Sequence, residues 1–149
     1  MVQRTLLDEI GYFDPNLKVG EDYDLWLRAS QVAQILRVSR PFALYRSHVA
    51  SITKSAPKEN YQGLVVQRAI ERWGIQAPGG KQANRHDVNC ALARTWSNYA
   101  GTVLEEGRSG QAWHAAMTSL KITIVQTAAW KILVKAALLR IYELPKRER

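Results

Sequence analysis

Apolar residues recur at helical spacing in the first third of the chain. Residues 6–10 place three of them on one side of a short helix, which Gly11 can end in a left-handed conformation. Gly20 then frees the backbone ahead of a second helix, whose first turn is acidic. The apolar face of this second helix, which we expect in the core, comprises Leu25, Ala29 and Val32.

The pattern changes to short β-prone runs after the second helix. Ile35–Val38 and Phe42–Tyr45 are mostly apolar, and Arg40–Pro41 separates them. Two strands are therefore predicted here. The polar, Ser/Thr-rich stretch over residues 47–57 is typical of a loop. Residues 1–57 are thus expected to form an α/β unit.

Helical spacing returns in residues 58–149, which we expect to be a helical extension. Gly74 ends the first of these helices, and a Pro/Gly-rich linker lies near residues 76–81. The predicted helices of the extension cover residues 61–70, 82–106 and 111–121.

The most apolar stretch runs from Ile122 to Tyr142, and Lys131 and Lys135 interrupt it. Because lysines are costly in hydrocarbon, we interpret this stretch as a surface or interface helix rather than a membrane span. Two interpretations stay open: a helix packed on its own domain, or one lying on anionic lipid with Trp130 and Tyr142 at headgroup depth. Its apolar stripe comprises Trp130, Leu133, Val134, Ala137, Leu138 and Ile141.

The composition indicates one folded domain that favours anionic partners. The chain has 149 residues, a formal net charge of +8 and a pI near 9.9. A nucleotide diphosphate or an anionic lipid surface fits this charge, whereas nucleic acid is set aside because no recognition motif is present. Cys90 is the only cysteine, so an internal disulfide is impossible, which fits a cytoplasmic protein.

Three acids stand together at the start of the second helix. Glu21, Asp22 and Asp24 follow a glycine and precede an apolar helix. Acids at this position stabilise a helix N-terminus, which is one explanation. The other is catalytic, because a carboxylate near a pocket can act as the general base that sugar transfer with inversion requires.

The acid cluster belongs to a longer pattern. Gly20–Arg28, followed by Tyr45–His48, resembles the second half of family 2 glycosyltransferases of the GT-A fold, over about the first third of the chain. The resemblance implies an α/β fragment, the second half of a nucleotide-diphospho-sugar transferase domain, followed by a mainly α-helical extension. It also implies an inverting, metal-dependent transfer of a sugar from a nucleotide-diphosphate donor to a cell-surface glycan or lipid-linked acceptor.

The same resemblance implies roles for individual residues. Asp22 would be the catalytic base, and Glu21 would bind or orient the acceptor. Arg28 would pair with a carboxylate or contact substrate phosphate, and Arg46 would bind the diphosphate. His48 would ligate the divalent cation, Mn²⁺ or Mg²⁺. Asp24, Leu25 and Trp26 are assigned to the helix and its packing.

The resemblance leaves part of such an enzyme outside this sequence. The family's donor half carries an Asp-x-Asp motif upstream, and no such half precedes Met1 here. We therefore expect the chain to be a fragment that is inactive alone. The alternative is a non-catalytic helical interaction module carrying a truncated transferase remnant. The expected location is the cytoplasm, with peripheral contact at the inner face of the plasma membrane as an open possibility.

Overall fold

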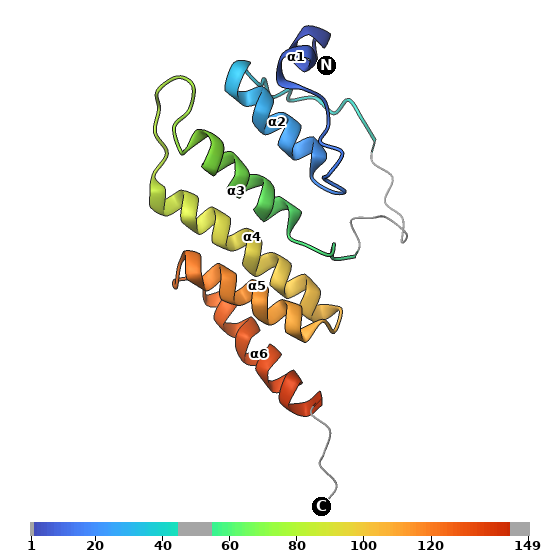
Figure 1. Ribbon diagram of the computed structural model, residues 1–149, viewed down its shortest axis with the longest axis vertical. Helices are drawn as coiled ribbons and strands as arrows, with labels where there is room; N and C mark the ends of the chain where they lie inside the picture. The colour runs from blue at the N-terminus through green and yellow to red at the C-terminus, as the bar shows by residue number, and fades with distance from the viewer. Residues whose placement is uncertain (1, 45–54, 144–149) are drawn as a thin grey trace, which may run out of the picture.

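The computed structural model describes residues 2–44 and 55–143, and helices are the regular elements of this part of the chain. The helices lie side by side in chain order, from α1 and α2 at one end to α6 at the other (Figure 1). Their bounds are α1 Arg4–Ile10, α2 Glu21–Val32, α3 Tyr61–Trp73, α4 Arg85–Glu105, α5 Ser109–Ile122 and α6 Thr127–Glu143.

The predicted α/β unit is wrong for the described residues. Ile35–Val38 and residues 42–44 form no strand, and the one β-type pairing in the described chain is an isolated bridge between Gln76 and Gln82. A strand needs a neighbour for its backbone N–H and C=O groups, and none of the described segments supplies one. The side chains of this run are consequently exposed, Leu36 by 75% and Phe42 by 79%. The β propensity of these side chains alone did not produce a sheet.

The predicted helix boundaries near glycines are confirmed. Gly11 has a φ of 82° and donates its N–H to the carbonyl of Leu7 at 2.9 Å, which ends α1. Gly20 has a φ of 85° and precedes α2. Both angles are in the region that glycine adopts without steric cost. The expectation for Val32 is wrong, because it is the last residue of α2 and half exposed.

The main core lies between α4, α5 and α6. Alanine dominates the contact surfaces, so the helix backbones can approach closely. Ser119 is fully buried, and its hydroxyl donates to the carbonyl of Ala93 at 2.7 Å, which joins α5 to α4. The buried cluster comprises Tyr99, Ala100, Val103, Leu104, Ala112, Ala115, Ala116, Leu120, Ala129, Leu133 and Ala136.

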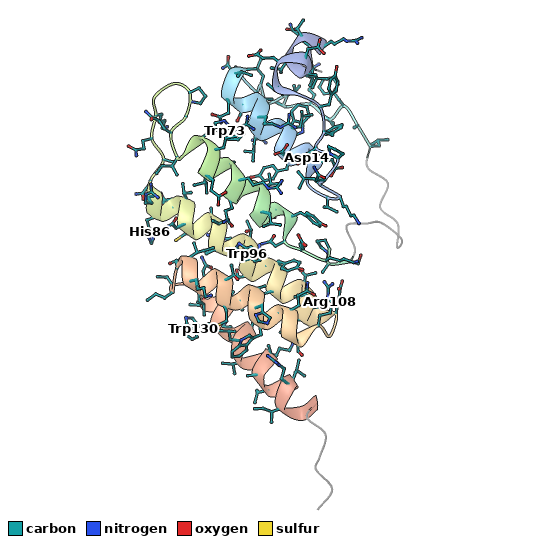
Figure 2. The ribbon with its side chains drawn as sticks, viewed as in Figure 1. Asp14, Trp73, His86, Trp96, Arg108 and Trp130 are labelled. Atoms are coloured by element: carbon teal, nitrogen blue, oxygen red, sulfur yellow. The ribbon has the colours of Figure 1, made fainter. Side chains whose placement is uncertain are left out.

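The segment before α3 is fastened to the turn between α4 and α5. The Tyr99 hydroxyl donates to the carbonyl of Lys58 at 2.7 Å, and Arg108 Nη2 donates to the carbonyls of Ala56 and Pro57 at 3.2 Å. Figure 2 shows Arg108 at that turn and His86 at the opposite end of α4. The predicted boundary at residue 57 therefore falls within a segment anchored to the helical extension; the division itself stays a prediction.

Candidate functional site around helix α2

One face of α2 fixes the helix to α1. Arg28 Nε donates to the Asp24 carboxylate at 2.9 Å, one helical turn away. Arg28 Nη1 donates to the carbonyls of Ile10 at 2.6 Å and Gly11 at 3.0 Å, and Nη2 donates to Tyr12 at 2.8 Å. These carbonyls lie at the end of α1, where the helix leaves acceptors without an internal partner. Arg28 therefore joins the two helices.

These contacts define what Arg28 and Asp24 do. The Arg28 side chain is only 12% exposed, and four of its five N–H groups have partners in these contacts. The predicted pairing of Arg28 with a carboxylate is confirmed, as is the assignment of Asp24 to the helix. A role of Arg28 in binding substrate stays a prediction, with a single N–H remaining for it.

The two remaining acids of α2 are placed differently from Asp24. Asp22 is exposed, and its Oδ1 accepts the backbone N–H of Tyr23 at 2.7 Å. Glu21 is half-buried as the first residue of the helix. Neither carboxylate forms an ion pair among the described residues. Asp22 therefore keeps an oxygen, Oδ2, that is available to an incoming group.

A groove begins one helical turn beyond Asp22 on α2, and Asp22 itself is not among the residues that line it. Side chains three, four and seven residues apart share one face of a helix, so Asp22 shares its face with Trp26 and Ala29. Both of these later residues line a groove of about 880 Å³ between α1, α2 and residues 33–38. This volume lies within the range of small-molecule sites. The groove is mostly apolar but carries polar side chains at its walls, namely Gln3, Thr5, Glu9 and Gln34.

The sequence did not reveal this groove. Trp26, which we had assigned to packing, is 44% exposed and lines the groove. Its four-residue separation from Asp22 was a usable signal, because that spacing puts both residues on one face. The opposite wall depends on how residues 33–38 return past α1, which no local pattern records.

A second, smaller cleft of about 310 Å³ lies between α2 and α3. Asp14 lies in it, and its carboxylate accepts the backbone N–H of Asn16 at 2.9 Å and approaches Arg68 at 3.5 Å. The hydrogen bond from Asn16 lowers the pKa of Asp14 below its ordinary value. Arg68 and Arg72 are four residues apart on α3, and the Arg72 guanidinium lies over the Trp73 ring. The residues that line this cleft do not include Glu21 or Asp22.

Arg46 and His48, predicted to bind the diphosphate and the cation, lie outside the described residues. The part of the chain that the structure describes holds no group of three or more His, Cys, Asp or Glu side chains suited to a metal ion. Cation binding through His48 stays a prediction, and no step below depends on it.

Comparison with protein-family models, with curated proteins and with solved structures gave no match to this chain. The functional argument consequently rests on the residues of α2 and the groove beside them.

Proposed function

We propose that this chain provides the acceptor-activating part of an inverting glycosyltransferase, with Asp22 as its general base. The observation that supports this proposal most directly is that the acids of α2 differ in their contacts. Asp24 and Arg28 hold the helix against α1, whereas Asp22 is exposed on the same helix face as Trp26, one turn before the groove that Trp26 lines.

The proposed step follows from that placement. Asp22 Oδ2 takes the proton of the acceptor hydroxyl while the acceptor oxygen forms a bond to the anomeric carbon of the donor sugar. The bond from that carbon to the nucleotide diphosphate breaks on the opposite face, so the configuration inverts. General base catalysis of this kind typically contributes about 10²–10⁴-fold to the rate.

The groove suits the acceptor. The flat indole of Trp26 offers an apolar face to a sugar ring, and glutamine, threonine and glutamate side chains along the walls can hydrogen-bond to its hydroxyls. Glu21 precedes Asp22 and would orient the acceptor. The hydrogen bonds from Arg28 to the carbonyls at the end of α1 fix the position of α2, and with it the position of Asp22. A general base contributes most to the rate when its geometry is fixed.

The donor belongs to a part of the site outside the described residues. We assign the nucleotide diphosphate to Arg46, and the divalent cation to His48, on the resemblance alone. The acceptor would be a cell-surface glycan or a lipid-linked sugar. The described helices supply the base and the acceptor groove, and donor binding requires residues beyond them.

A second candidate function is a non-catalytic helical interaction module. The packed core of α4–α6 favours it, because that core is formed without any residue of the groove. The exposed apolar run over residues 35–44 also favours it, since such a run suits a partner surface. A module of this kind would bind its partner equally well with or without the Asp22 carboxylate.

The two functions are distinguished by the effect of Trp26→Ala on sugar transfer. If Trp26 supports the acceptor, KM for the acceptor should rise by roughly tenfold while KM for the nucleotide sugar stays within twofold. Phe13→Ala, which removes an exposed aromatic side chain that does not line the groove, is the matched control for general loss of apolar surface. Unchanged acceptor KM in Trp26→Ala would remove the groove from the proposal.

A further inference from the structure

Helix α6 has two apolar faces, and only one of them is covered. Ala129, Leu133 and Ala136 are buried in the core shared with α5 and α4. Val134 and Leu138, one turn apart on another face, are 61% and 63% exposed. The single apolar stripe that the sequence predicts is therefore divided, because Leu133 lies in the core whereas Val134 and Leu138 are exposed. An exposed face of this length is unusual for a helix that serves only its own core.

The exposed face continues into the turn before the helix. Trp130 Nε1 donates to the carbonyl of Ile124 at 3.0 Å, so the turn is held beside the start of α6 (Figure 2). This bond also satisfies the indole N–H, and the ring can enter an apolar phase without an unpaired donor. The α6 stripe, as we call this surface, comprises the exposed residues Ile124, Val125, Trp130, Val134, Leu138 and Ile141.

Positive charge accompanies the stripe. Lys131 and Lys135 each follow a stripe residue, are exposed, and project about 100° further round the helix. No Asp or Glu occurs between Glu106 and Glu143, whereas this span contains five Lys or Arg residues. The span from residue 107 to residue 142, which holds α5 and all of α6 except its last residue, therefore carries basic side chains without any acidic one.

We propose that the α6 stripe lies on an anionic lipid surface, independently of the function proposed for α2. An apolar face edged by lysines matches the boundary between acyl chains and anionic headgroups, where the lysine stems follow the apolar surface and the ammonium groups meet phosphate. Bound nucleic acid would leave the apolar stripe exposed to water. An apolar groove on a protein partner would not explain the lysines beside the stripe. None of the helices in the described residues could cross a bilayer, which agrees with a helix lying in the interface.

The test is sedimentation of the 149-residue chain with vesicles of phosphatidylglycerol and phosphatidylcholine, compared with vesicles of phosphatidylcholine alone. We expect binding to the anionic vesicles that weakens at least tenfold in 0.5 M salt, because surface charges are screened there. Val134→Asn combined with Leu138→Asn should weaken binding more than tenfold. Lys131→Gln combined with Lys135→Gln should weaken it by a similar factor on anionic vesicles, about fivefold per charge.

Leu36→Asn is the control, since it removes an exposed leucine far from α6 and should leave vesicle binding unchanged. Circular dichroism of each variant verifies that the helices are intact, as expected for exposed positions. Lack of binding to anionic vesicles overturns the proposal, and so does binding that persists in the Val134/Leu138 variant. If the chain binds no vesicles and instead forms a dimer that the Val134/Leu138 variant dissociates, the stripe is the contact surface for a second copy of the chain.

Discussion

Arg28 and Asp24 form an ion pair of 2.9 Å within α2, and the same guanidinium binds the carbonyls at the end of α1. The contact therefore has two effects. It stabilises a helix whose first turn carries three acids, and it sets that helix at a fixed place against its neighbour. The position of Asp22 depends on both.

Replacing Arg28 by lysine should destabilise the chain by about 2 kcal/mol. An ammonium group is a single point and cannot serve the carboxylate and the carbonyls together, so partly buried acceptors lose their donors. Urea unfolding measures the change. Arg72→Lys is the control, because Arg72 is exposed and contacts the Trp73 ring, and it should change stability by less than about 0.5 kcal/mol. Equal losses of stability in the two variants would contradict the role of Arg28 in joining α1 to α2.

Gly63→Ala should destabilise the chain although alanine favours helices. A methyl group at Gly63 would meet the Asn60 side chain, with its Cγ 3.0 Å away, and that side chain caps α3 by accepting the N–H of Gly63 at 3.1 Å. Losing a cap typically costs ~1 kcal/mol. Gly101→Ala has room, since its nearest neighbour atom, on Ile132, is 3.8 Å away, and should stabilise by up to ~1 kcal/mol. Thermal unfolding of both variants should thus show shifts of opposite sign.

Stability should decline at high pH through Tyr99. Burial raises the pKa of Tyr99 above its ordinary value of 10.0, and Arg108 offsets part of that rise. Because the folded chain holds the neutral phenol, this contribution is complete below pH 10.0 and is lost as the pH rises through the folded pKa. Denaturant midpoints from pH 8 to 11 measure the decline. Tyr99→Phe should start less stable, without the bond to Lys58, and then decline less steeply.

How far the sequence could predict the fold depends on how local each signal is. The end of α1 at Gly11 and the start of α2 after Gly20 follow from single residues whose backbone freedom decides the outcome. The side chains of Ile35–Val38 and Phe42–Tyr45 predict two strands, but strands form only in pairs, and a run of side chains does not encode its partner. The same limit applies to the site.

The acid pair was visible in the sequence, whereas the groove lined by Trp26 requires residues 33–38 to pass α1. The sequence also did not show that α6 has one covered and one exposed apolar face. A periodic pattern shows that a helix has apolar residues, and it does not show which of them a neighbouring helix covers. Ala129 and Ala136 are covered because α5 packs there, and Val134 and Leu138 are left exposed.

The central claim is that Asp22 is the base, and the turnover of Asp22→Asn in a sugar-transfer assay tests it most directly. Asparagine keeps the shape and the contact with Tyr23 but cannot accept the acceptor proton, so kcat should fall by about 10²–10⁴-fold with little change in donor affinity or melting temperature. Asp24→Asn is the control: it weakens the pair with Arg28, lowers stability and should reduce kcat far less. Near-normal turnover in Asp22→Asn, or a larger loss of kcat in Asp24→Asn, would contradict the account.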